Sequence, residues 1–198
     1  QTVDPDYTKG EKLEGDRNFW ALGPTGAIAN IWGRGTGDPT VNTRMLQIRE
    51  VLPDTPAAGV LEQADVILGV VSPMPAGVDR SSGRFSADAR KVLSAAITEA
   101  EQKANGGKLV LNIWRNGKPM PATLILPVKG SYSVSSPWDC EKTSVIIDEA
   151  AQSIIEKGFF RKSRSGNPVA HGGIGNFLDA LGLLATGEDQ YLPAVRDY

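Results

Sequence analysis

The sequence predicts an α+β protein with five to six strands and two helices, followed by a C-terminal helical hairpin. Three observations predict this class. Apolar or alternating runs of strand length recur over the first 130 residues. One long segment among them, residues 86–104, has the periodicity of an amphipathic helix. From Pro137 onward, helical periodicity replaces the strand patterns.

The first strands are separated by turn residues. Residues 27–32 (AIANIW) follow a glycine turn, and residues 45–52 (MLQIREVL) alternate polar and apolar side chains as a half-buried strand does. Thr55 followed by Pro56 indicates the start of one helical turn. Residues 66–71 form a continuous apolar run, which is typical of a strand buried on both faces.

The second part of this region combines a loop, a helix and a hairpin. Residues 72–85 are rich in Pro, Gly and Ser and predict a loop. The helix over 86–104 presents small and apolar side chains on one face. Two strands over 108–115 and 122–128 then flank Asn116–Gly117, a strong hairpin signal.

The C-terminal part predicts helices. Asp139 is a suitable N-cap for a helix that runs to Lys157, and Asn167–Pro168 begins a second helix that ends at Gly187. A helical hairpin alone buries too little surface to be stable, so it either packs on the first domain or begins a larger helical domain. The expected divisions are an irregular leader over 1–16, a first domain over 17–130 and a helical region over 131–198.

Composition excludes several classes. The 198 residues carry a net charge of −2, so we expect no nucleic-acid partner, because such proteins need a basic surface. No apolar stretch reaches the ~18 residues that a membrane span requires. The single cysteine, Cys140, and single histidine, His171, cannot supply the Cys and His clusters that zinc sites use. We therefore expect no metal and no cofactor.

The N-terminus bears on localisation. The chain begins with Gln1 and a polar, irregular stretch. Removal of a secretory signal would leave such a mature N-terminus, which favours an extracytoplasmic location, periplasmic or secreted. A cloning boundary would look the same, so both explanations stay open.

Signals of catalysis are missing. The GRGTG segment at 33–37 is not followed by Lys-Ser/Thr, and the glycines before it lead into a strand rather than a phosphate-binding helix. No GxSxG or HExxH motif is present. A Cys140–His171 pair stays open beside the simpler interpretation of a structural thiol and a surface or cap histidine. We therefore expect that the chain is not an enzyme.

The order strand, short helix, buried strand, long helix and hairpin resembles a PDZ domain over residues 17–130. VLPDTPAAGVLEQADVILGVV and KLVLNIWRNGKPM carry the resemblance, and LGPTGAIANI falls where a PDZ domain has its carboxylate-binding loop. The resemblance implies a partly open β-barrel or sandwich that binds peptides. Thr25 and Ala27 are smaller than the usual loop residues, and the long helix does not begin with histidine, so no preference set by that histidine can be carried over. In the first of these segments, the matching residues are Pro56, Ala57, Gly59, Leu61, Asp65, Val66 and Ile67.

This resemblance implies a mechanism of peptide capture. A peptide would add as a strand beside 27–32, with the helix 86–104 as the opposite wall. The backbone N–H groups of Thr25, Gly26 and Ala27 would hold its C-terminal carboxylate, and the last side chain would be apolar and small to medium in size. In an alternative, the leader 1–16 or the loop 72–85 fills the groove itself. The expected peptide-binding residues are Leu22, Gly23, Thr25, Gly26, Ala27, Ile28, Ala29 and Asn30, with Ala89, Leu93 and Ala96 from the helix.

The C-terminal sequence carries a second resemblance. GNPVAHGGIGNFLDALGLLATGEDQYLPAVRDY is similar to a helical hairpin of α/α-toroid proteins. Together with the first domain it looks like a group of exported bacterial proteins that join a PDZ-like domain to a toroid. This implies an alternative function, a regulatory or substrate-recruiting domain of an exported enzyme whose catalytic toroid lies mostly beyond this chain.

Overall fold

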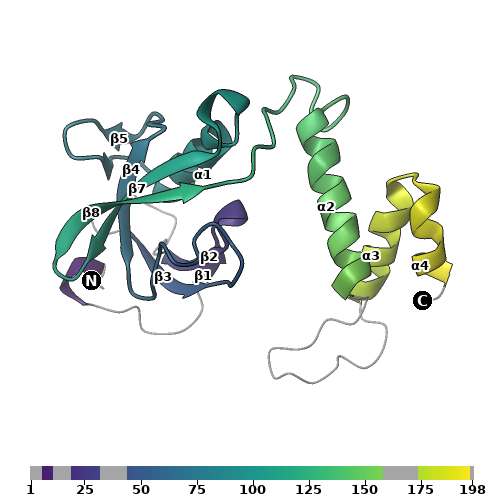
Figure 1. The fold of residues 1–198 in the computed structure, drawn as a ribbon, viewed down its shortest axis with the longest axis horizontal. Helices are drawn as coiled ribbons and strands as arrows, with labels where there is room; N and C mark the ends of the chain where they lie inside the picture. The colour runs from purple at the N-terminus through teal and green to yellow at the C-terminus, as the bar shows by residue number, and fades with distance from the viewer. Residues whose placement is uncertain (1–5, 11–18, 32–43, 158–173, 197–198) are drawn as a thin grey trace. The chain divides into compact units, whose positions relative to one another are not determined.

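The computed structural model describes residues 6–10, 19–31, 44–157 and 174–196 (Figure 1). The chain divides into two compact units, Gln1–Ser131 and Tyr132–Tyr198, and each is described by itself. The GRGTG segment, Asn167–Pro168 and His171 lie outside the described residues, so the predictions made for them stay predictions.

The first unit contains a six-stranded sheet in which every pairing is antiparallel and the strand order is β1-β2-β3-β4-β7-β8. A two-stranded hairpin, β5–β6, lies within the predicted loop 72–85, and one helix, α1, follows it. The strands are β1 (Phe19–Ala21), β2 (Ala27–Ile31), β3 (Leu46–Val51), β4 (Val66–Ser72), β5 (Val78–Asp79), β6 (Arg84–Phe85), β7 (Lys108–Arg115) and β8 (Lys118–Ile125).

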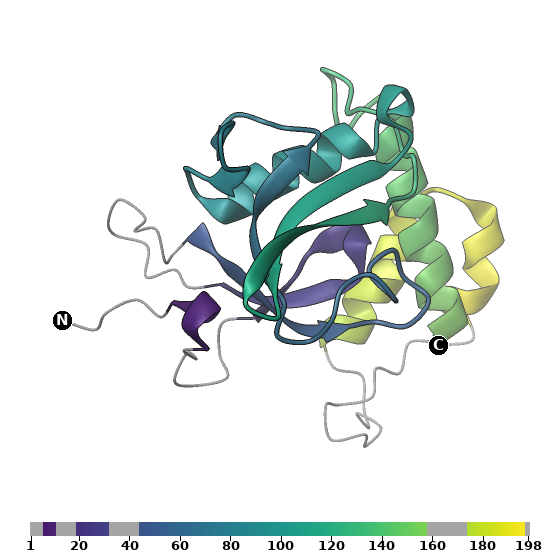
Figure 2. The ribbon, with the colours of Figure 1, turned by 60° about the vertical axis from the view of Figure 1, so that its left-hand side comes forward.

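Helical elements complete this unit, and the predicted α+β class is confirmed. Asp88 caps α1, and its Oδ1 accepts a hydrogen bond from the Arg90 amide at 2.9 Å. Figures 1 and 2 show α1 beside β4 and β7, on which it packs. The helix is α1 (Ala89–Ala100), and the 3₁₀ turns are η1 (Tyr7–Lys9), η2 (Gly23–Thr25) and η4 (Lys103–Asn105).

The main core lies between α1 and the sheet. Its residues come from one face of the helix and from alternate positions of the strands, as amphipathic elements require. The helix contributes Ala89, Val92, Leu93, Ala96, Ile97 and Ala100.

Strand β8 begins four residues earlier than the predicted strand at 122. Its first half contains Pro119 and Pro121, which pair in register with Trp114 and Asn112 of β7. Proline has no N–H and is confined to edge strands, with its nitrogen turned away from the neighbouring strand. Leu126 donates inward to the Gly107 carbonyl at 2.8 Å, so even positions face β7 and both prolines face outward. Because proline is rare inside strands, the sequence pattern did not predict this first part of β8.

A buried ion pair ties three elements of this unit together. Arg115, at the end of β7, donates from Nε and Nη2 to the two carboxylate oxygens of Asp65, at 2.7 and 2.5 Å. Nη2 also donates to the Val60 carbonyl at 2.8 Å, and Asp65 accepts from the Glu62 amide at 2.8 Å. The Asp65 side chain is only 2% exposed. The start of β4, the end of β7 and the turn that precedes β4 are therefore held at one point.

The second unit is helical. Its core joins Ala151 of α2, Ala180 and Leu183 of α3, and Tyr191. The first half of α2 does not share this core, since Ile147 is 44% exposed. The elements are α2 (Glu141–Lys157), α3 (Ile174–Ala185), η5 (Asp189–Tyr191) and α4 (Leu192–Arg196).

Cys140 lies just before α2 and is buried. Its Sγ accepts a hydrogen bond from the Ser133 amide at 3.3 Å. Hydrogen bonds, first from the Thr143 side chain and then from the Ser133 amide, lower the pKa of this thiol to about 6. His171 is not described, so the suggested Cys140–His171 pair stays untested.

The described part of the chain lacks two features. None of its helices is both long and apolar enough to cross a membrane. No group of three or more His, Cys, Asp or Glu side chains in it could hold a metal ion.

The buried ion pair leads to a stability prediction. We expect Arg115→Met to lower the free energy of unfolding by about 3–5 kcal/mol, because it leaves the Asp65 carboxylate buried without its cation. Arg90→Met is the matched control. Arg90 makes the same two-pronged contact with Asp88, at 3.0 and 2.6 Å, but at the surface, so its loss should cost less than about 1 kcal/mol. Urea unfolding of both variants measures the difference, and equal losses would contradict the assignment.

Candidate functional site

The candidate site is the loop from Leu22 to Gly26, between β1 and β2, where a carboxylate-binding nest was predicted. The Thr25 amide donates to the Leu22 carbonyl at 3.4 Å, and the Gly26 amide donates to the Gly23 carbonyl at 3.2 Å. The Ala27 amide donates to Thr25 Oγ1 at 3.1 Å. All three N–H groups therefore have partners inside the loop. The prediction that they point together at a bound carboxylate is wrong for this arrangement.

The Thr25 side chain contributes to the hydrogen bonds that close the loop. Thr25 is 1% exposed, and its Oγ1 donates to the Leu22 carbonyl at 2.9 Å while it accepts from Ala27. A large apolar residue could not make either bond. The Thr25 hydroxyl thus serves the loop's own closure.

The loop is also docked on the segment that follows β3. Gly26 and Thr25 offer their carbonyls to the Leu52 and Ala57 amides, at 2.9 and 3.0 Å. Gly26 has φ +75, and a Cβ there would lie 2.2 Å from Thr55 Cβ. Glycine is therefore required twice, once for the left-handed backbone and once for the close approach.

The strand position beside β2 is occupied by the chain itself. β1 pairs with β2 through Phe19↔Asn30, Trp20↔Ala29 and Ala21↔Ile28, and β3 pairs with the other edge. The open edge expected beside residues 27–32 is therefore absent. The occupant is β1, the short strand between the leader and the Leu22–Gly26 loop. In the self-filling alternative, the occupant was instead the leader 1–16 or the loop 72–85.

The predicted binding residues are brought together, but most of them are covered. Strand, loop and helix positions meet in the main core rather than in an open groove. Asn30 is 8% exposed, Ile28 is half-buried and Gly23 is exposed. The covered residues are Leu22 (8% exposed), Thr25 (1%), Ala27 (1%), Ala29 (0%), Ala89 (2%), Leu93 (3%) and Ala96 (0%).

Sequence reasoning missed β1 and its Trp20. Trp20 is 59% exposed although it pairs with the fully buried Ala29, so it stands at the rim of the sheet. The run FWA was a usable signal, but three residues are too few for alternation to indicate a strand.

The chain was compared with protein families, curated proteins and solved structures. No protein-family model and no curated protein matches the chain. Among solved structures, an HtrA-type protease (AlgW) with a decapeptide is similar, with a TM-score of 0.32 and 20% sequence identity. The similarity covers 61% of this chain and only 31% of the protease chain. A likeness at this level carries no functional argument, so function rests on the contacts described above.

The loop geometry leads to a prediction about its two glycines. We expect Gly26→Ala to lower the free energy of unfolding by about 2–4 kcal/mol, from the positive φ and the collision with Thr55. Gly23→Ala is the matched control, since Gly23 also has positive φ but faces open space, and it should cost only about 1 kcal/mol. Adding Thr55→Gly should recover part of the Gly26→Ala loss. Urea unfolding midpoints compare the variants, and equal losses at both glycines would argue against the docked loop.

Proposed function

We propose that the first unit is a PDZ-like module that captures an extended peptide as an added strand beside β2. The observation that carries this proposal is β1 itself. It lies antiparallel on β2, and Leu22 directly after it inserts into the core that contains Ala89, Leu93 and Ala96. A short piece of the chain thus makes the contacts that strand addition would give a partner, and the partner would take its place.

The size of β1 supports its displacement. It has three residues, against five in β2, and both Trp20 and Ala21 are exposed. Each backbone hydrogen bond contributes only about 0.5–1.5 kcal/mol net, so a longer peptide that matches all of β2 has the advantage. The far edge of the sheet does not compete, because Pro119 and Pro121 remove two of the donors that an added strand needs there.

The side chain that the ligand prefers follows from the space that Leu22 vacates when β1 is displaced. The helix contributes Ala89, Leu93 and Ala96 to this part of the core, and β2 contributes Ala27 and Ala29. Apart from Leu93, these side chains are small, and they leave room for one apolar side chain of leucine size. We therefore propose a ligand with a small-to-medium apolar residue at the position of Leu22. Affinity in the micromolar range, about −8 kcal/mol, suits a few hydrogen bonds and one buried side chain.

We propose no catalytic role for this chain and an extracytoplasmic location, on the sequence grounds given above. The alternative function, a recruiting domain of an exported enzyme, is favoured by one observation. Leu181 and Leu184 of α3 are 59% and 46% exposed, as they would be if further helices covered them. A native reading frame that continues past Tyr198 into helical repeats would support this alternative, and a stop codon there would overturn it.

Locking β1 in place tests the proposed function. Ala21 and Ile28 face each other at a non-hydrogen-bonded position, where cross-strand side chains are close enough for a disulfide. In a Cys140→Ser background, we expect the oxidised Ala21→Cys/Ile28→Cys variant to lose binding of a labelled RNFWAL peptide, the chain's own 17–22 sequence. The reduced form should bind it as the background does. Fluorescence anisotropy measures both, and equal binding by the oxidised and reduced forms would sink the proposal.

The opposite change loosens β1. Trp20→Pro removes an N–H that faces β2, whereas Ala21→Pro, its matched control, removes one that faces outward. The first variant should bind the RNFWAL peptide about fivefold more tightly, since one hydrogen bond is worth about 1 kcal/mol. The control should bind it as the unmodified chain does, and the same gain in both variants would argue against competition.

A third prediction concerns the C-terminal end of the peptide. The Gly26 and Ala27 amides have acceptors within the loop that do not depend on Leu22, so we expect the free-acid and C-terminally amidated forms of RNFWAL to bind with affinities within about twofold of each other. Parallel anisotropy titrations of the Trp20→Pro variant make this comparison. A large preference for the free acid would restore the carboxylate nest predicted from the sequence and contradict the loop geometry described above.

A further inference from the structure

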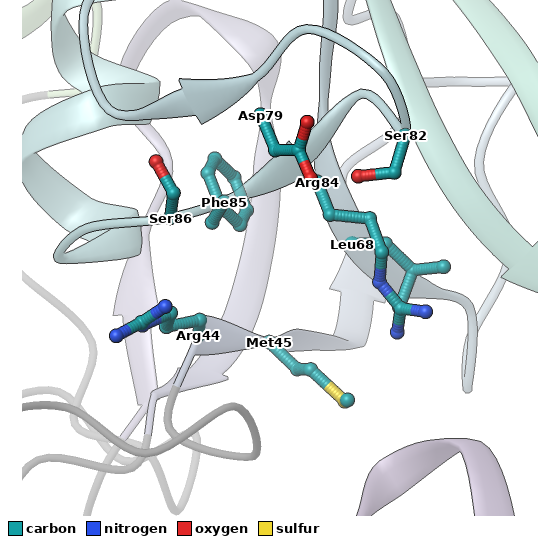
Figure 3. A pocket seen from close by; sticks show the side chains of 8 residues that line it. All are labelled: Arg44, Met45, Leu68, Asp79, Ser82, Arg84, Phe85 and Ser86. Carbon is teal, nitrogen blue, oxygen red and sulfur yellow. The ribbon is translucent and has the colours of Figure 1, made fainter.

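A pocket of about 200 Å³ lies between the start of β3, β4 and the β5–β6 hairpin (Figure 3). It does not involve β1, β2 or α1, so it is separate from the proposed peptide site. Its lining combines a buried apolar floor with two guanidinium groups and two hydroxyls at the rim. The lining residues are Arg44, Met45, Leu68, Asp79, Ser82, Arg84, Phe85 and Ser86.

The fold holds the rim of this pocket in a fixed position. Gly69 of β4 lets the hairpin cross closely, because a Cβ there would lie 2.0 Å from the Gly83 carbonyl oxygen and 2.7 Å from Arg84 Cα. Asn112 of β7 donates from Nδ2 to the Ser82 carbonyl at 3.1 Å. The turn that carries Ser82 and Arg84 is thus fastened to β4 and β7.

The two arginines are the unusual feature. Among the described residues, Arg44 Nε is buried without a hydrogen-bond partner, and neither guanidinium forms an ion pair. A buried donor without an acceptor carries a desolvation cost that a bound anion would remove. Figure 3 shows Arg44 and Arg84 on opposite sides of the pocket.

The one acid of the pocket is already engaged. Asp79 Oδ1 accepts from the Ser81 amide and hydroxyl at 2.8 and 2.7 Å. These bonds, the hydroxyl first, lower the pKa of the Asp79 carboxyl, so the group stays ionised at neutral pH. With two guanidinium groups and one carboxylate, the pocket keeps a net positive charge.

The floor sets the shape of the ligand. Met45, Leu68 and Phe85 are 3%, 2% and 5% exposed and offer only apolar surface. The volume is below the roughly 300–1,000 Å³ of pockets for drug-sized ligands, so a small metabolite fits it better.

We propose that this pocket binds a small dicarboxylate, with one carboxylate on each guanidinium and the apolar spacer on the Met45–Leu68–Phe85 floor. Guanidinium groups pair with carboxylates through two parallel hydrogen bonds, which suits two arginines on opposite sides of one cavity. The hydroxyls of Ser82 and Ser86 at the rim add further donors.

Glutarate tests the assignment as the probe, with acetate and inorganic phosphate as comparison anions. We expect glutarate to bind the full chain at least about tenfold more tightly than either, because only glutarate carries two carboxylates, one for each guanidinium. Amide shifts of Met45, Leu68 and Arg84 in ¹⁵N–¹H spectra report the site. Equal, weak binding of all three anions, or shifts elsewhere, would overturn the proposal.

Charge-removing variants complete the test. Arg44→Gln and Arg84→Gln should each weaken glutarate binding about tenfold, and the fold should survive because neither guanidinium has a partner in the described chain. Arg80→Gln, an exposed position on the same hairpin that does not line the pocket, is the matched control and should leave affinity unchanged. A similar loss in all three variants would show a general charge effect and reject the pocket.

Discussion

The Asp65–Arg115 ion pair is the constraint on which the first unit depends. Arg115 reaches both Asp65 and the Val60 carbonyl, so it fixes the turn between β3 and β4 against the sheet. That turn presents the Ala57 amide to the Thr25 carbonyl. The position of the β1–β2 loop is therefore set by a charge pair on another part of the sheet. A buried, two-pronged pair suits this task because its geometry admits only one arrangement.

Much of the sheet could be predicted because its signals are local. The continuous run at Val66 and the Asn116–Gly117 turn each correspond to one structural requirement. β1 and the start of β8 were missed for different reasons. β1 is stabilised by its pairing with β2 rather than by any periodicity of its own. The start of β8 depends on prolines that only an edge position tolerates.

The site was harder to predict than the sheet. The sequence indicated Gly26 as part of this loop, where the structure gives it a positive φ of 75. It could not show that Thr25 would take up the neighbouring donors, because that depends on docking against Leu52 and Ala57. Likewise, Ala89 and Ala96 fit either a ligand pocket or a packed core. Periodicity identifies the face of a helix that is covered, but it does not identify what covers it.

The prolines of β8 also affect how this protein behaves in concentrated solution. An exposed edge strand is a template on which further copies of a chain assemble into continuous sheets. With Pro119 and Pro121 on its outer side, β8 lacks the regular ladder that such growth requires. Strands from further copies of the chain therefore cannot extend the sheet at the β8 edge through a regular set of hydrogen bonds. The same two residues that concealed a strand from sequence analysis thereby protect the folded chain against aggregation through that edge.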